Sequence, residues 1–292
     1  MLQNLVQLLL TTLQIGAVVI LFALGLTLIF GVLRIVNFAH GQFFTLSALV
    51  VAVAVPLLTQ RGLPVALAYL AAVMAGVAVA TAVGMVVYQW GFRRLERDMI
   101  GSFILSTGVV LLLEGAFLEI FGGAVRPVPP LVQGNVEWLG FTMAAQRLLL
   151  CAIALAFTVG LAVLLTATRF GRSLRAVAID HEAAMLQGIP YRKIALRGFL
   201  LATLIGALAG ALTAPISAVS PTLGDAYLIK GFIAVVIGGL GSVGGAILGS
   251  LMIASIETFG GFFFDPSAAS LATFVLVMFI LLVRPKGLLG HG

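Results

Sequence analysis

Charge is scarce in this chain. Only 9% of its 292 residues are Asp, Glu, Lys or Arg, whereas a soluble domain carries about 25%. Hydrophobic residues make up 62% of the chain, and the first charged residue is Arg34. The core of a soluble domain of this length is too small to bury so much apolar surface. The composition therefore excludes an ordinary soluble domain and predicts an integral membrane protein.

Residues that form metal sites and disulfides are also few. Cys151 is the only cysteine, so an internal disulfide and a cysteine-ligated metal are excluded. The three histidines, His40, His181 and His291, are scattered, and no acidic residue or second histidine stands at ligand spacing from His40. We expect neither a metal nor a cofactor.

The chain has no motif for nucleotide chemistry of its own. The pattern GxxxxGK[ST], which cradles phosphates, is absent. Paired intramembrane carboxylates and a nucleophile–base pair are also absent, which argues against a membrane-embedded enzyme. The net charge of +6 is better explained by cytoplasmic loop cations than by nucleic-acid binding. We therefore expect a protein that is not an enzyme and binds no nucleic acid.

Long apolar runs dominate what is present. A helix needs about 20 apolar residues to cross a bilayer, and barrel strands would instead alternate over about 10 residues. The chain is predicted to be an all-α integral membrane protein, one transmembrane domain over 1–292, with about seven to nine membrane segments. Short or broken helices are expected near 32–44 and 228–250. The apolar runs are 5–31, 43–60, 64–90, 101–121, 147–168, 198–219, 228–259 and 268–284.

The distribution of cations predicts an orientation. The start MLQNLVQLLL lacks the positive region of a signal peptide, so we expect it to remain as the first membrane helix. The positive-inside rule places the N-terminus outside, the C-terminus in the cytoplasm, and twelve of the sixteen Lys and Arg residues inside. The other four are Arg61, Arg126, Arg147 and Lys230.

Two segments place polar or glycine residues between apolar runs. In RIVNFAHGQ, residues 34–42, the residues Asn37, His40, Gly41 and Gln42 are either a solvated turn or part of a pathway through the membrane. Glu114 stands well inside an apolar run, where it either lines a path or lies near the outer end.

The second segment, IGGLGSVGGAILGS at 237–250, contains GxGxxG. Its apolar flanks argue against a dinucleotide site, which needs a soluble βαβ unit. The favoured explanation is close helix packing, because Gly206/Gly210, Gly241/Gly245 and Gly245/Gly249 are spaced four apart. Glycine breaks also mark substrate paths in transporters, so Gly239 and Gly241 are pathway candidates.

A polar island interrupts the apolar sequence. Residues 175–193 hold five of the 26 formal charges, and neither 148–168 nor 198–224 holds any. We expect a short cytoplasmic helix over 174–187, with Ser173 as its N-cap and Gly188 before Pro190 ending it. Such a helix is either a docking surface or an ordinary surface helix.

Five segments stand out as motifs: the EAA pattern at 182–189, GLTLIFGVLRIVNFAHGQFFTLSAL at 25–49, FGRSLRAVAID at 170–180, KGFIAVVIGGLGSVGGAILG at 230–249 and RPKGLLG at 284–290. Together they resemble one family, the LivH/LivM permeases of branched-chain amino-acid ABC transporters. The resemblance covers nearly the whole chain and looks closest to the LivH type. Gln42 stands where this family often has glutamate.

The resemblance implies a role for the polar island. The loop 169–197 would couple the membrane domain to an ATPase, through Glu182, Ala183, Ala184, Gly188 and Ile189. The implied partners are a second permease of the LivM type, two ATPase subunits, a soluble binding protein and the membrane lipid of a bacterial inner membrane.

The cargo implied is a branched-chain or other hydrophobic amino acid. Permeases for urea, amides or small organic acids belong to the same family and remain open. An ATP-independent secondary transporter, with Glu114 as its coupling site, is the alternative from another class.

Overall fold

The computed structural model describes residues 2–95, 98–138 and 141–290. Arg97 and His291 lie outside the described residues. Eight helices in the described part are long and apolar enough to cross a membrane, which confirms the predicted all-α membrane fold. They are α1 (Leu2–Leu33), α2 (His40–Gln60), α3 (Val65–Trp90), α4 (Met99–Phe121), α5 (Ala145–Ala167), α8 (Tyr191–Thr213), α10 (Val243–Phe263) and α11 (Pro266–Val283).

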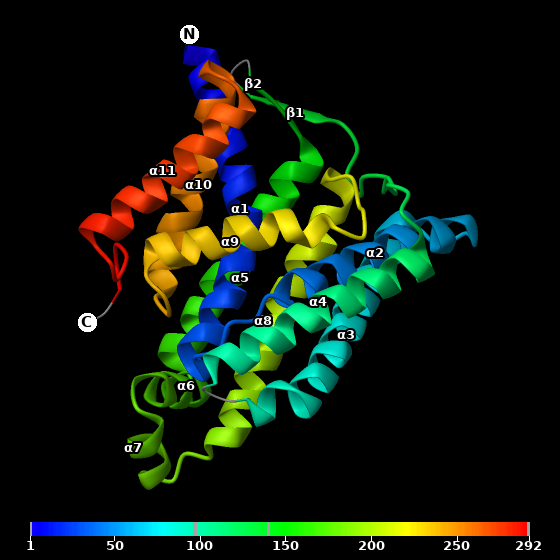
Figure 1. Cartoon of the computed structure of the whole chain (residues 1–292). Helices are drawn as coiled ribbons and strands as arrows, with labels where there is room; N and C mark the ends of the chain where they lie inside the picture. The colour runs from blue at the N-terminus through cyan, green and yellow to red at the C-terminus, as the bar shows by residue number, and fades with distance from the viewer. Residues whose placement is uncertain (1, 96–97, 139–140, 291–292) are drawn as a thin grey trace.

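The bundle has a central and a peripheral set of helices (Figure 1). In the most apolar stretch of α1, 78% of the residues are buried, and in those of α2 and α8 67% are buried. In α4 and α11 the corresponding values are 11% and 17%, and the side chains they expose are mainly apolar. Apolar side chains exposed on a helix surface suit contact with lipid or with another apolar helix. Because α1 has the largest share of buried residues, the core is built around α1.

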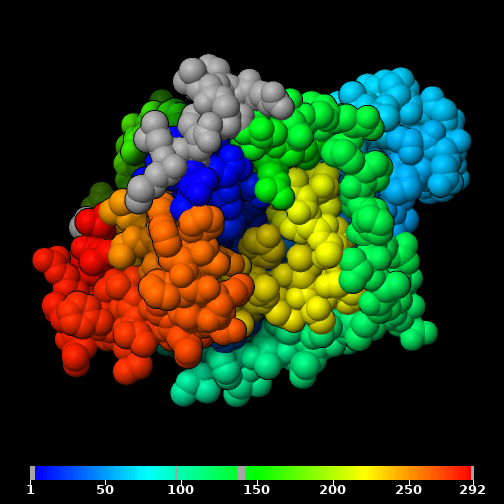
Figure 2. Space-filling view, turned by 90° about the horizontal axis from the view of Figure 1, so that it is seen from above, coloured from blue at the N-terminus to red at the C-terminus, as the bar shows by residue number. Residues whose placement is uncertain are grey.

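One end of the bundle carries the N-terminus and a small hairpin. Strands β1 (Asn135–Trp138) and β2 (Phe141–Ala144) pair antiparallel, and the Gln7 side chain donates to the Thr142 carbonyl at 3.2 Å. The hairpin was not expected from the sequence. Seen from this end, the surface is hollowed between α1 (blue), the segment around the end of α8 (yellow) and α10 (orange) (Figure 2).

The opposite end carries the short helices α6 (Arg169–Ile179) and α7 (His181–Leu186), which extend beyond the long helices (Figure 1). Here the Arg34 side chain donates to the Ala178 carbonyl at 3.5 Å. Short 3-10 turns, η1 (Phe92–Arg94) and η2 (Ala214–Ile216), complete the described elements.

Both predicted breaks are present. Helix α1 ends at Leu33, residues 34–39 are not helical, and α2 begins at His40. The His40 ring packs against Gly25, eight residues before the end of α1, so α2 begins about 12 Å along α1 from that end. Non-helical backbone at this depth is tolerated because protein surrounds it: Ile35, Asn37 and Ala39 are buried.

The second break separates α9 (Leu223–Gly238) from α10. Helix α9 has 16 residues and is about 24 Å long, which is less than a membrane thickness of about 30 Å. Gly239 and Gly241 make the turn with φ of +104° and +83°, a conformation that favours glycine.

Glycine packing holds the central helices together. A Cβ on Gly210 would lie 2.0 Å from the Phe44 carbonyl oxygen, and one on Gly249 would lie 2.1 Å from that of Ala234. A Cβ on Gly245 would lie 2.1 Å from the Gly238 carbonyl oxygen, and one on Gly206 would lie 2.6 Å from the His40 ring. The predicted packing role is confirmed for these glycines. Gly241 differs, because it serves the turn instead of a helix crossing.

Candidate functional site

The starts of α2 and α9 meet inside the bundle. A Cβ on Gly224 would lie 2.0 Å from the Gly41 carbonyl oxygen, so the two backbones touch. The Thr45 hydroxyl donates to the Gly41 carbonyl at 3.0 Å and accepts from the Gly224 N–H at 2.9 Å. Two helix N-termini, each the positive end of a helix dipole, are thereby held side by side within the protein.

Polar side chains gather at this junction. The Gln42 amide donates to the Asp225 carboxylate at 3.1 Å, and Glu114 of α4 lies close enough to act electrostatically on Asp225. Gln42 is fully buried, and its carbonyl oxygen has no hydrogen-bond partner among the described residues. The structure thus brings the candidates Gln42 and Glu114 together through Asp225.

Sequence reasoning missed Asp225. It lies just after the uncharged run 198–224 and 111 residues from Glu114, so no spacing links the two. One signal was available, because an acidic residue in the first turn of a helix suits the helix dipole.

His40 is packed among apolar groups. Its ring is fully buried and meets the Phe22 ring edge to face, with centroids 4.8 Å apart. Gly25 and Gly206 leave the space that the ring fills, since a Cβ on either would lie 2.6 Å from it. The ring therefore locks α1, α2 and α8 together, which gives His40 a packing role whatever else it does.

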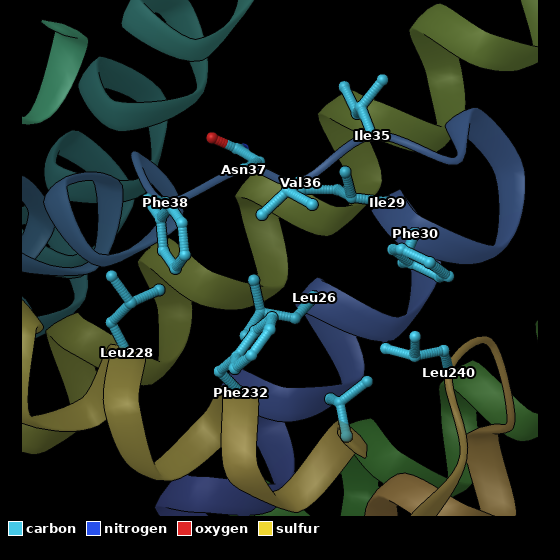
Figure 3. A pocket seen from close by; sticks show the side chains of 11 residues that line it. Leu26, Ile29, Phe30, Ile35, Val36, Asn37, Phe38, Leu228, Phe232 and Leu240 are labelled. Carbon is cyan, nitrogen blue, oxygen red and sulfur yellow. The ribbon is translucent and has the colours of Figure 1, made fainter. Parts of the chain in front are cut away.

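The two broken segments border one narrow cavity (Figure 3). Asn37 and Leu240 both line it, together with apolar side chains that include Phe38, Leu228 and Phe232. Its volume of about 20 Å³ has room for about one water. In this conformation the region is closed to a solute.

Gly239 and Gly241 flank Leu240 at the edge of this cavity, away from His40. The C-terminal tail holds their turn: the N–H groups of Leu288 and Leu289 donate to the carbonyls of Ile237 and Gly238 at 2.8 and 2.9 Å. The tail therefore satisfies carbonyls that the end of α9 would leave unpaired.

The polar island differs in detail from the helix predicted over 174–187. The N-cap is Thr168, whose hydroxyl accepts from the Gly171 N–H at 3.0 Å, and Ser173 lies inside α6. Asp180 then divides the segment, because its carboxylate accepts from the N–H groups of Glu182 and Ala183 and starts α7. A local cap thus competes with continuation of the helix.

The predicted end of the island is correct. Gly188 has φ of +78°, its N–H donates to the Met185 carbonyl, and the Ile189 N–H donates to that of Ala184. These paired bonds form a Schellman motif, in which glycine is favoured because of its left-handed φ.

Helices α6 and α7 both present exposed apolar side chains. Ile179, the last residue of α6, is 80% exposed, and Met185 and Leu186 of α7 are 47% and 87% exposed. Of the predicted coupling residues, Glu182 and Ala183 are exposed, whereas Ala184 is buried and holds α7 in place. Sequence reasoning missed Ile179 and Leu186. The adjacent exposed pair Met185 and Leu186 on α7 indicates a surface that another protein covers.

These features define a class of protein. Eight candidate membrane helices, two broken segments meeting inside the bundle and a capped helical projection at one end are the features of a multi-pass membrane permease. The chain belongs to the family described as "Branched-chain amino acid transport system / permease component", whose sequence model matches residues 8–283.

Two branched-chain amino-acid permeases match the chain over nearly its whole length, and a sugar permease matches about half of it. The chain is 29% identical to the high-affinity branched-chain amino acid transport permease BraD of Pseudomonas aeruginosa, over 96% of this chain and 94% of that protein. It is 26% identical to the permease LivH of Escherichia coli, over 95% and 92%. The ribose import permease RbsC of Bacillus subtilis is 29% identical, over 56% of this chain and 52% of that protein.

Proposed function

We propose that this chain is a membrane-spanning subunit of an ABC importer for branched-chain or other hydrophobic amino acids, powered by a separate ATPase. The observation that carries the proposal is the capped helix α7, which presents Leu186 and Met185 to solvent at one end of the bundle. A surface of this kind needs a partner, and the chain has no phosphate-binding loop of its own. An ATPase docked there would supply the energy. The permease therefore acts as a transport subunit and not as an enzyme.

The assembly proposed has four kinds of component besides the membrane lipid. This chain pairs with a second permease of the LivM type, two ATPases dock on the two permeases, and a soluble binding protein delivers the amino acid. Residues 1–292 form a single permease domain, with 169–197 as its coupling loop. The sparsely buried α4 and α11 offer apolar surface for lipid and for the second permease.

The proposed orientation places the hairpin end outside and the α6–α7 end in the bacterial cytoplasm. The cations Arg34, Arg169 and Arg172 lie at or near the α6–α7 end, as the positive-inside rule requires. With eight crossings alone, both termini would lie on one side. Counting α9 with the segment before it as a ninth passage puts the N-terminus outside and the C-terminus inside.

The proposed pathway passes between the two broken segments. Asn37, Gln42 and Asp225 place polar groups there, His40 and Gly41 set the position of α2, and Glu114 borders the junction from α4. Gly239 and Gly241 would let the α9–α10 turn shift. ATP binding to the partner would favour a second conformation in which the narrow cavity opens, because a ligand shifts an equilibrium by its differential affinity for the two states.

The coupling role is tested with a matched pair of variants on α7. Leu186→Asp places a charge in the proposed interface, and Gln187→Asp places the same charge at the next exposed position. We expect Leu186→Asp to release the ATPase on purification and to lower ATP-driven uptake at least about tenfold, the effect of 1.4 kcal/mol. Gln187→Asp should retain both. ATPase retention and normal uptake in both variants would contradict docking at this surface.

The cargo is tested separately in proteoliposomes that contain the complete complex and its binding protein. L-leucine, L-isoleucine and L-valine should be taken up in an ATP-dependent manner, and urea and ribose should not. Uptake of urea or ribose alone would overturn the amino-acid assignment and leave the importer assignment standing. Uptake without ATP that is abolished by Glu114→Gln would instead indicate a secondary transporter.

A further inference from the structure

A charged pair lies between α9 and α10, on the side of α9 away from the junction. The Lys230 ammonium and the Glu257 carboxylate are 2.6 Å apart, and their side chains are 34% and 37% exposed. The distribution of cations placed Lys230 on the outer side of the membrane, and the structure places it in the middle of α9. Ionisable side chains inside a membrane protein are costly and usually functional.

The pair borders a cavity of about 270 Å³ between α9, α10 and α11. This volume approaches the lower limit of known ligand pockets, about 300 Å³. Ser270 and Thr273 of α11 add hydroxyls, and the remaining lining is mainly apolar, including Ile229, Ile233 and Phe274. The cavity is thus far larger than the closed one beside Asn37.

The two charged groups retain unused bonding capacity. Oε1 of Glu257 accepts from Lys230, while its Oε2 is buried without a hydrogen-bond partner among the described residues. A lysine ammonium has three N–H donors, and the bond to Glu257 uses one. An acceptor for a cationic group and donors for an anionic group therefore stand next to each other.

The depth of the pair decides which ligand fits. Glu257 lies 14 residues from the start of α10 and six from its end, about 21 Å and 9 Å along the helix. Gly231, next to Lys230, packs on the Phe22 ring of α1. A lipid headgroup would have to descend about 9 Å from the helix end to reach the pair, whereas transporters bind solutes near the midplane.

We propose that this cavity binds a zwitterionic amino acid. Its ammonium would meet Oε2 of Glu257, its carboxylate would meet Nζ of Lys230, and its apolar side chain would lie against Ile229, Ile233 and Phe274. This inference rests on the proposed function for its substrate class. The same head chemistry, an ammonium beside an acid, occurs in phosphatidylethanolamine, so the test separates these two sources.

The test uses the complete complex in phosphatidylcholine vesicles, with and without phosphatidylethanolamine. Ser270→Trp fills the cavity and leaves both residues of the ion pair unsubstituted. Leu271→Trp places the same side chain on the neighbouring exposed face of α11. Binding and ATP-driven uptake of radiolabelled L-leucine are measured. Unlabelled 4-methylpentanoate, which lacks the ammonium, and isopentylamine, which lacks the carboxylate, serve as competitors. Bound phosphatidylethanolamine is measured by mass spectrometry of the purified complex.

The expected result is a loss of L-leucine binding of at least about tenfold in Ser270→Trp and in Glu257→Gln, with little change in Leu271→Trp. Neither competitor should displace L-leucine as well as unlabelled L-leucine does. Loss of copurified phosphatidylethanolamine with unchanged L-leucine binding would overturn the amino-acid proposal in favour of a lipid headgroup. Equal L-leucine binding and equal lipid retention in all variants would overturn the site altogether.

Failure of the proposed function would look different. The unmodified complex would then neither bind nor take up L-leucine, before any variant is compared.

Discussion

The two sides of α9 differ in how their charges are balanced. Asp225 and Lys230 are five residues apart, so their side chains leave the helix about 140° apart. Toward α2 and α4, Asp225 lies near Glu114, and the described residues provide neither carboxylate with a salt bridge. Toward α10 and α11, Lys230 and Glu257 neutralise each other.

The side of α9 with Asp225 and Glu114, here called the acidic side, is packed more tightly than the side with Lys230 and Glu257, here called the neutral side. The acidic side is closed, with backbones touching at Gly41 and Gly224 and a neighbouring cavity of about 20 Å³. The neutral side leaves about 270 Å³ open. Placing an oppositely charged pair in apolar surroundings costs less free energy than placing two like charges there. The comparison indicates that the acidic side needs a conformational change or a partner before it meets a solute, whereas the neutral side has room for one in this conformation.

The largest effect is expected from closing the gap between the α2 and α9 backbones. Gly224→Ala would place a Cβ 2.0 Å from the Gly41 carbonyl oxygen, so we expect a loss of about 3 kcal/mol in stability, as for overpacked cores. Thermal unfolding of the purified complex measures the loss.

The control for Gly224→Ala is Gly160→Ala in α5, where nothing lies within 4 Å of the new methyl group. Alanine favours a helix over glycine by about 0.5–1 kcal/mol. An unfolding temperature in Gly224→Ala that matches or exceeds that of Gly160→Ala would show that the contact is not tight.

A smaller effect is expected from separating the charged pair on the other side. Lys230→Met and Glu257→Met should each lower the unfolding temperature, because each leaves one charge without its partner. The double variant should recover part of the loss, with a coupling of about 1–2 kcal/mol, since the pair is partly exposed. Additive losses in the double-mutant cycle would mean that the two charges do not interact.

The acidic side can be made more acidic. Gln42→Glu would bring a carboxylate to within about 3 Å of Asp225, judged from the 3.1 Å hydrogen bond of Gln42. Two carboxylates this close share one proton. Uptake by the variant should therefore depend more steeply on pH than uptake by the unmodified chain, with the lower rate in alkaline buffer, where the shared proton is lost. Initial uptake rates across a pH series, compared with the unmodified chain, measure this change, and parallel pH profiles would argue against it.

The smallest effect is expected at the start of α11, which forms one wall of the open cavity. The Asp265 carboxylate accepts from the N–H groups of Ser267 and Ala268 at 2.7 and 3.0 Å, and these bonds lower its pKa. A lowered pKa means that the stabilisation is present above the ordinary pKa of aspartate and is lost as the pH falls through the lowered value. Asp265→Ala should thus reduce the unfolding temperature slightly at neutral pH and not in acid. A reduction of equal size at both pH values would mean that the charge is not what stabilises the cap.

Much of the fold was predictable because it depends on local sequence. Apolar runs long enough to cross a bilayer predicted the membrane helices, and the breaks near residues 32–44 and 228–250 are where polar residues and glycines interrupt them. The division of the polar island at Asp180, where α7 begins, was missed because Ser173 and Asp180 are both plausible N-caps by residue type. The choice between them depends on which backbone N–H groups each can reach.

The sites were less predictable. Asn37, His40, Gly41 and Gln42 were predicted as candidates because they are neighbours in one unusual segment. Asp225 was missed because its partner Gln42 lies 183 residues away, and the pairing of Lys230 was missed because its partner Glu257 lies 27 residues away on another helix.

The sequence alone determined that this protein spans a membrane, roughly where most of its membrane helices begin and end, and where two breaks occur. These outcomes follow from hydrophobic length and glycine content, which are properties of single segments. Only the tertiary structure decided which polar groups meet, with Asp225 facing Gln42 and Lys230 facing Glu257. Such pairings depend on the angle at which α9 crosses α1, α2 and α10, and that angle is set by glycine contacts between distant segments.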